Sequence, residues 1–249
     1  MVEPRQDSSK SSRHEWFMTT HWSVVRRLES NDSSRARAAL ETLYRTYWYA
    51  LYAFTRRLGH GVADAEDLVQ GFFERCLERH YLSAAEQAKG RFRSFLLLAF
   101  KRFMANESAR TRTRKRGGGQ PLVALDALSP EERYAQEPAD QLSPDKLFER
   151  RWALTLLEQV LGRLRAEQAA AGRLAVFEAL KDCLASAGRG TPYAELASRL
   201  GTSEGAVKVA AHRLRQRYRQ LLEEEIAHTV SSPEEIREER QYLLAILSR

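Results

Sequence analysis

Apolar residues recur at helical spacing through most of the first half of the chain. Between residues 35 and 58 they fall at i, i+3, i+4 and i+7, which predicts an amphipathic helix. A second helix is expected to begin at the N-cap candidate Asp64 and to run to about residue 80. A third helix, rich in phenylalanine, extends from Phe92 towards Arg116, and the glycines at 117–119 end this block.

The second half shows further helical patterns after an interruption. Residues 120–145 contain several prolines and no sustained period, so they are interpreted as a linker. A last short helix is expected to start with Ser232 at its N-cap and Pro233 at its first position. Between the linker and this helix, helical patterns cover about 146–166, 170–186, 192–201 and 203–226.

No segment of useful length alternates as a strand would. The sequence therefore predicts an all-α fold, with two helical domains joined by a flexible acidic linker and a helix-turn-helix in the C-terminal domain. The expected division is a disordered lead at 1–18, a first domain at 19–119, the linker at 120–145, a second domain at 146–226 and a helical extension at 227–249.

The distribution of charge favours a polyanionic partner. The formal net charge is +7 and the isoelectric point is near 9.6, as in many nucleic-acid-binding proteins. Basic residues gather at 101–116 and return at 208–219, whereas acidic residues outnumber basic ones between 126 and 150. The charge along the chain is thus basic, then acidic in the linker, then basic again.

Other functional classes find little support. No apolar run is long enough to span a membrane, and residues 1–16 lack the apolar segment of a secretory signal. Cys76 and Cys183 lie far apart within helical apolar patterns, which favours buried reduced thiols and a cytoplasmic location. Since no cluster has the spacing of metal ligands or of a catalytic set, we expect no catalytic residue, no metal and no cofactor.

Residues 193–214 have the spacing of a helix-turn-helix. Ala197 is small where two helices would approach closely, and Gly201 can take the left-handed conformation of the turn. Ser203 can cap the second helix, and Val207 can fill the space between the two helices. The rest of the shared core is expected from Leu196, Leu200, Ala210 and Leu214.

The opposite face of the second helix is polar and basic, as in a recognition helix that enters the major groove. This face carries Glu204, Lys208, His212, Arg215 and Arg219. Base-edge contacts are expected from Lys208, His212 and Arg215, and phosphate contacts from Arg213, Arg217 and Arg219. The alternative is a surface helix with a solvated charged face, and a helix-turn-helix alone would also suit repressors, activators and recombinases.

Three quoted stretches resemble one protein family. "DAEDLVQGFFERCLERH" (64–80), followed by "GRFRSFLLLAFKRFMANESARTRTRKR" (90–116), resembles domain 2 of the extracytoplasmic-function sigma factors of bacterial RNA polymerase. "PYAELASRLGTSEGAVKVAAHRLRQRYR" (192–219) resembles domain 4. The opening "TTHWSVVRRLESND", with the C-terminal extension, is similar to a planctomycete-like subgroup. The resemblance covers roughly 35–116 and 147–226.

The resemblance implies a non-enzymatic sigma factor that directs core polymerase to promoters by −35 duplex binding and −10 strand opening. Its partners would be the polymerase core, through the β′ clamp and the β flap, and promoter DNA; an anti-sigma protein is a further candidate. The acidic linker would thread towards the RNA exit channel. The extension at 227–249 would pack on domain 4 or occupy the site of an anti-sigma protein.

The resemblance also assigns site residues. Core polymerase binding falls on the acidic face of the helix at 64–80, which otherwise would be a solvated face: Glu66, Asp67, Gln70 and Glu74. Recognition of −10 DNA falls on the helix at 92–116 and the loop before it: Arg91, Arg93, Lys101, Arg102, Arg110, Arg112 and Arg114. Recognition of −35 DNA falls on Ser203, Glu204, Lys208, His212, Arg213, Arg215 and Arg217. Phenylalanines of the −10 helix could stack on unpaired bases, although core packing is favoured for Phe95 and Phe103.

The chain departs from the family pattern at several positions. Gly71 stands where the family usually has Glu, and Val209 and Ala210 replace Ser and Arg, so polar −35 contacts are not expected at Val209. A helix-turn-helix regulator that binds a palindromic duplex without polymerase is the alternative function. A DNA-processing enzyme is a third class, which would need a catalytic constellation.

Overall fold

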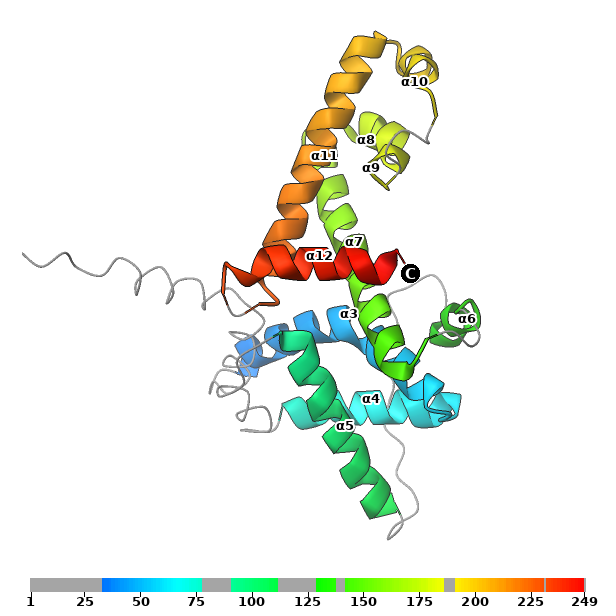
Figure 1. Cartoon of the computed structure of the whole chain (residues 1–249), viewed down its shortest axis with the longest axis vertical. Coiled ribbons are helices and arrows are strands. Elements are labelled where there is room, and N and C mark those ends of the chain that lie inside the picture. The colour runs from blue at the N-terminus through cyan, green and yellow to red at the C-terminus, as the bar shows by residue number, and fades with distance from the viewer. Residues whose placement is uncertain are drawn as a thin grey trace, which may run out of the picture. The chain divides into compact units, whose positions relative to one another are not determined.

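The structure is a computed structural model that describes residues 33–77, 91–111, 129–137, 142–185, 191–230 and 232–248. All regular elements in these ranges are helices and none is a strand, so the predicted all-α class is confirmed there (Figure 1). The helices form two compact units. The first combines the described residues up to Leu154 with those from Ala227 onwards, and the second is Thr155–Ile226. None of the helices described is long and apolar enough to cross a lipid bilayer.

The first unit has a largely aromatic core. It contains α3 (Ser33–Arg57), α4 (Val62–Cys76), α5 (Phe92–Thr111), α6 (Pro130–Ala135), the start of α7 (Pro144–Ala170) and α12 (Glu235–Leu247). Phe100 of α5 meets Phe72 of α4 edge to face, with ring centroids 5.1 Å apart, and meets Phe54 of α3 at 6.1 Å. Such ring pairs add about 0.5–1.5 kcal/mol each beyond the burial of their surface. They hold α3, α4 and α5 together.

The phenylalanines of α5 belong to this core. Phe92, Phe100 and Phe103 are buried, and Phe95 is half-buried. Phe92 packs against Tyr47 of α3, with ring centroids 5.7 Å apart. Core packing was predicted for Phe95 and Phe103; it is confirmed for Phe103, whereas Phe95 is half-buried. Phe92 and Phe100 are also core residues, so their rings are not presented for stacking on bases.

Two details of α4 differ from the sequence-based expectation. The helix begins at Val62 after Gly61, so Asp64 lies in the first turn instead of at the N-cap. A Cβ added at Gly71 would lie 3.4 Å from the Phe103 ring, so this position faces α5. Gly71 therefore permits close helix packing, and a larger side chain there would press on the core.

The predicted linker contains an ordered helix, α6. Ser129 and Glu132 form a capping box: the Ser129 Oγ accepts from the Glu132 N–H at 3.2 Å, and the Glu132 carboxylate accepts from the Ser129 N–H at 2.7 Å. Glu131 accepts two hydrogen bonds from Arg56 of α3, at 3.0 and 2.7 Å, and one from the Tyr52 hydroxyl at 2.7 Å. Residues 129–137 thus belong to the first unit and do not form a flexible link.

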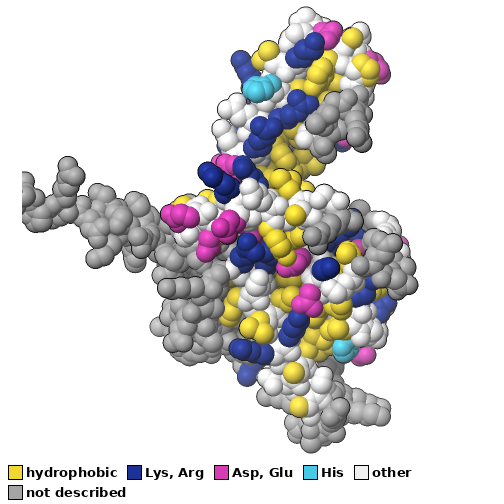
Figure 2. All heavy atoms as spheres, in the orientation of Figure 1, with side chains coloured by type: hydrophobic (Ala, Val, Ile, Leu, Met, Phe, Trp, Pro, Cys, Tyr) yellow, Lys and Arg dark blue, Asp and Glu magenta, His cyan; other side chains and the backbone are white. Residues whose placement is uncertain are grey.

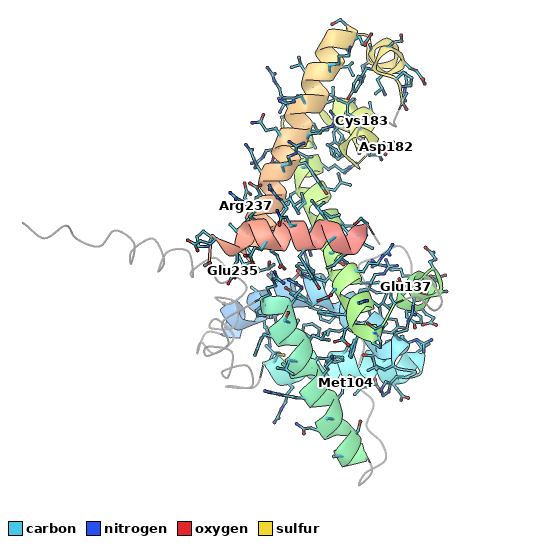
Figure 3. All side chains as sticks on the ribbon, in the orientation of Figure 1. Met104, Glu137, Asp182, Cys183, Glu235 and Arg237 are labelled. Carbon is cyan, nitrogen blue, oxygen red and sulfur yellow. The ribbon has the colours of Figure 1, made fainter. Side chains whose placement is uncertain are left out.

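Glu137, just after α6, is a second anchor of this segment (labelled in Figure 3). Its carboxylate accepts a hydrogen bond from the Tyr49 hydroxyl at 3.2 Å and pairs with Arg151 of α7. Asp145, at the start of α7, pairs with Lys101 of α5. Three acidic residues that were expected in a flexible acidic linker are therefore paired with cations of the first unit: Glu131, Glu137 and Asp145.

The second unit contains the rest of α7, α8 (Leu174–Leu180), α9 (Asp182–Ala185), α10 (Tyr193–Leu200) and α11 (Glu204–Ala227) up to Ile226. Helix α7 continues to Ala170, and Gly172, with φ of 68°, ends it in the left-handed conformation. The single helix predicted at 170–186 is divided into α8 and α9. Cys183 of α9 is buried and free, as is Cys76 of α4, so the prediction of buried thiols is confirmed.

Candidate nucleic-acid interface

The turn between α10 and α11 has the geometry that the sequence predicts. Gly201 ends α10 with φ 62° and ψ 35°, a left-handed conformation that favours glycine. The Thr202 N–H donates to the carbonyl of Ala197 at 3.0 Å, which closes the last turn of α10. The Ser203 Oγ then accepts from the Ala206 N–H at 3.2 Å and caps α11. Of the −35 residues assigned, Ser203 thus has a structural role at the helix start.

The interior between α10 and α11 is small and apolar. Leu196, Val207 and Leu214 are buried, and Ala197 is 6% exposed. Leu200 is only half-buried, and Ala211 occupies the buried position that was predicted for Ala210. Positions 207, 211 and 214 lie at i, i+4 and i+7, so they share the buried face of α11. The opposite face is then left to solvent.

The exposed face of α11 is predominantly basic. It presents Lys208, His212, Arg213, Gln216 and Arg219, together with Glu204 near its start. Lys208 Nζ lies 2.7 Å from the Glu204 carboxylate, and the hydrogen bond that Lys208 donates to this carboxylate raises the pKa of Lys208. Both side chains are exposed, so this ion pair is weak, and Lys208 can exchange the Glu204 carboxylate for a DNA phosphate at little cost in free energy. Figure 2 shows Lys and Arg side chains spaced along the length of the second unit.

Arg215 and Arg217 are held inside the second unit instead. Arg215 donates to the Cys183 carbonyl at 3.0 Å and to the Tyr193 hydroxyl at 2.9 Å. Arg217 donates two hydrogen bonds to Glu167 of α7, at 2.9 and 2.7 Å. These bonds lower the pKa of Glu167 and raise that of Arg217. Each guanidinium joins elements of the second unit, although Arg217 keeps 36% of its side chain exposed, and the DNA contacts of these two arginines stay a prediction.

The acidic face of α4 is largely open. Asp67 and Glu74 are exposed, and Glu66 and Gln70 are half-buried. The Gln70 amide donates to the Glu74 carboxylate at 2.9 Å. Burial, together with the nearby charge of Glu66, raises the pKa of Tyr44 on α3 to about 12. The structure therefore brings the four residues assigned to polymerase binding onto one side of α4.

Arg93, assigned to −10 DNA, is buried at the start of α5. Its side chain is 2% exposed and pairs with Glu239 of α12, which is fully buried. The Arg93 guanidinium also lies 4.8 Å from the ring centre of Trp152 and 4.5 Å from that of Tyr242. Burial lowers the pKa of Arg93, with Arg91 acting in the same direction. An exposed phosphate cannot reach this group, so its prediction as a DNA contact is corrected.

Arg91 belongs to the same cluster. Its Nε lies 2.7 Å from the Glu239 carboxylate, and its guanidinium lies 5.0 Å from the ring centre of Tyr242. The Tyr242 hydroxyl donates to Glu149 of α7 at 2.5 Å. The extension, which was expected to pack on domain 4 or to occupy an anti-sigma site, therefore belongs to the first unit, where it packs on α5 and the start of α7.

The remaining −10 candidates lie further along α5. Lys101 is exposed, pairs with Asp145 and lies 5.5 Å from the Phe54 ring centre. Arg102, the next residue, is also exposed. Arg112 and Arg114, with the side chain of Arg110, lie outside the described residues. So do residues 1–32, the loop at 83–90 and the linker residues 120–128.

The Arg93–Glu239 cluster was not found from the sequence. Its acidic and basic members are separated by most of the chain, and neither stretch carries a motif that joins them. Within the described residues, no group of three or more His, Cys, Asp or Glu side chains is placed to hold a metal ion. Comparison of the chain with protein-family models, with curated proteins and with solved structures finds no match.

Proposed function

We propose that the chain is a sigma factor, a subunit that directs bacterial core RNA polymerase to promoters. The observation that carries the proposal is the pairing of α10 and α11. A left-handed glycine, a serine cap and a small apolar interior join the two helices, and α11 keeps a basic face open. A helix of this kind, with a helix-turn-helix as its support, suits the major groove of a −35 duplex.

Within this face, the candidates for DNA contact are Lys208, His212 and Arg213. All three are exposed, and Arg213 is placed to contact phosphate while Lys208 and His212 face the base edges in the proposal. Arg219 extends the basic face by a further turn and a half. Arg215 and Arg217 support the fold, and their predicted DNA contacts are not needed for the proposal.

The acidic face of α4 supports the second part of the proposal, docking on core polymerase. Asp67 and Glu74 are exposed and would repel duplex DNA, so a basic protein surface is the fitting partner. The resemblance described above names the clamp helices of β′ as this surface. Asp67 and Gln70 match the docking positions of the family.

The proposed −10 surface is narrower than the sequence indicated. It contains Lys101 and Arg102 on the exposed side of α5, and it excludes Arg93, which is buried against Glu239. The linker does not thread freely as an acidic chain between 129 and 137, because this segment packs on α3.

The proposal is tested by mixing the full-length chain with bacterial core polymerase. Binding is measured by fluorescence anisotropy, and initiation by run-off transcription from promoters with randomised −35 and −10 elements. Asp67→Arg combined with Gln70→Ala is expected to weaken core binding at least tenfold, the loss expected for an interface hot spot. Glu238→Arg, an exposed reversal of an acidic residue on α12, is the matched control and should bind as wild type.

Two results would count against the proposal. The first is absence of core binding, or core binding that the double variant leaves intact. The second is tight binding of a palindromic duplex by the chain alone, without any stimulation of transcription, which would support a polymerase-independent regulator instead.

A further inference from the structure

Val209 is an exposed apolar residue on the basic face of α11. Its relative exposure is 50%, although α11 buries valine at position 207. Single exposed apolar residues are common on protein surfaces, so exposure alone assigns no role to Val209. Its neighbours on the face are more informative. The residues at i−4, i−3, i+3 and i+4 are Gly205, Ala206, His212 and Arg213, and all of them are exposed.

The first turn of α11 carries only small residues on the exposed side that contains Val209. Gly205 has no side chain, and a Cβ added there would have no neighbour within 4 Å. Ala206 adds a single methyl group. Val209 is therefore the first bulky uncharged side chain on the exposed side of α11. In a helix-turn-helix, this part of the second helix lies closest to the base edges.

The surrounding charges indicate what can cover Val209. Lys208 and Arg213 flank it and would oppose a purely apolar protein pocket, since both would lose water there and only Lys208 has a partner among the described residues, in its exposed pair with Glu204. Duplex DNA can cover both the charged and the apolar side chains, because its phosphates neutralise Lys208 and Arg213 while its major groove offers one apolar group to Val209. This group is the C5-methyl of thymine, which valine can contact and which cytosine lacks.

We propose that Val209 contacts the C5-methyl group of a thymine and makes one position of the bound duplex thymine-specific. The inference rests on the proposed function, since it requires α11 to enter a major groove. It adds a specificity-determining residue at a position where a polar contact was not expected.

The test removes the C5-methyl group from thymine or the γ-methyl groups from Val209. Duplexes are first enriched from a random pool by the full-length chain, and each thymine of the enriched sequence is then replaced in turn by uracil, which lacks only the C5-methyl. At one position, uracil is expected to weaken binding by wild type about fourfold, the equivalent of about 0.8 kcal/mol for one methyl-sized contact. Val209→Ala should bind the thymine and uracil duplexes equally at that position.

Two variants serve as controls. Val209→Ile keeps the apolar contact and should keep the preference for thymine. Val62→Ala truncates a valine of α4 that is 38% exposed and should leave the preference and the affinity unchanged. Circular dichroism of each variant should match wild type, because both side chains are solvent-exposed.

The outcomes separate this inference from the proposed function. Equal uracil effects in wild type and Val209→Ala at every thymine would overturn the contact while leaving DNA binding in place. A loss of core polymerase binding by Val209→Ala, with the thymine preference unchanged, would overturn it in favour of a protein contact. Failure to enrich any duplex would overturn the proposed function together with the inference.

Discussion

Replacing Glu239 with alanine is expected to destabilise the first unit strongly. The Glu239 side chain is fully buried between Arg91 and Arg93, and the Arg93 side chain is 2% exposed. Removal of one partner from a buried ion pair typically costs 3–5 kcal/mol, because the remaining charge stays buried. Glu149, with its carboxylate 4.0 Å from Arg93, and two aromatic rings compensate in part. We therefore expect a loss of about 3 kcal/mol in the free energy of unfolding.

Tryptophan fluorescence isolates this effect. None of the four tryptophans of the chain lies within Thr155–Ile226, so urea unfolding followed by fluorescence reports on the first unit. With an m-value of about 2 kcal/mol/M, the expected loss lowers the urea midpoint by about 1.5 M. Glu238→Ala is the matched control. Its side chain is exposed one residue away, and its effect should stay within about 0.5 kcal/mol.

A double variant tests the cause. If the loss comes from stranding Arg93, then Arg93→Met combined with Glu239→Leu should recover most of the stability, since apolar residues of similar size often replace buried ion pairs at little cost. Arg91 does not need replacement because its side chain is 33% exposed and can reach water. The reasoning is refuted if Glu239→Ala costs no more than Glu238→Ala, or if the double variant is less stable than Glu239→Ala.

Three further predictions concern other contacts. Glu131→Gln should lower the first unit's urea midpoint at neutral pH. Hydrogen bonds from Arg56 lower the pKa of Glu131, so the stability that the Glu131 carboxylate contributes is present above its ordinary pKa of 4.5 and is lost as the pH falls. The urea midpoints of wild type and Glu131→Gln should therefore converge in acid, and a difference that stays constant with pH would contradict this cause. Gly71→Ala should change the free energy of unfolding by less than about 1 kcal/mol, because the gain in helix propensity opposes the 3.4 Å approach of the new Cβ to Phe103. Gly71→Leu should cost about 1–3 kcal/mol, because its larger side chain presses on the same ring. A Gly71→Leu variant as stable as wild type in the same urea assay would refute the close packing. Arg213→Ala should weaken duplex binding uniformly across sequences and reduce the slope of log K against log salt by about 1, with an unchanged circular dichroism spectrum; a sequence-dependent loss would instead indicate a base contact.

Local sequence features predicted the α10–α11 turn well. Gly201, Ser203 and Val207 act through contacts within a few residues of themselves or across one short turn. Their roles depend on backbone conformation and helical period, which can be predicted from a stretch of twenty residues. The error at position 210, where Ala211 is buried instead, is one residue: both alanines lie about one turn after Val207, at i+3 and i+4, and local spacing does not distinguish them.

The tetrapeptide Ser-Pro-Glu-Glu shows where local reasoning ends, since it occurs at 129–132 and at 232–235. At the first site it forms the complete capping box of α6, within a stretch that was interpreted as a linker. At the second, where a Ser232 cap was predicted, α12 begins at Glu235 and has no side-chain cap. The chain before α12 is constrained by Thr229, which is fully buried and whose carbonyl accepts from the Phe92 N–H at 3.1 Å. The same four residues therefore begin helices differently because their tertiary contacts differ.

The sequence by itself determined the helical class, the turn before α11 and the acidic face of α4, because helical periodicity and caps are local properties. It could not determine which charged residues are available to a partner. Arg93 and Arg102 stand on the same helix, α5, yet one is buried against Glu239 and the other is exposed. Arg213 and Arg217 likewise share α11, but only Arg217 meets Glu167 of α7. Long-range packing decides this difference, since a charge is freely available to a partner only if the fold has not already paired or buried it.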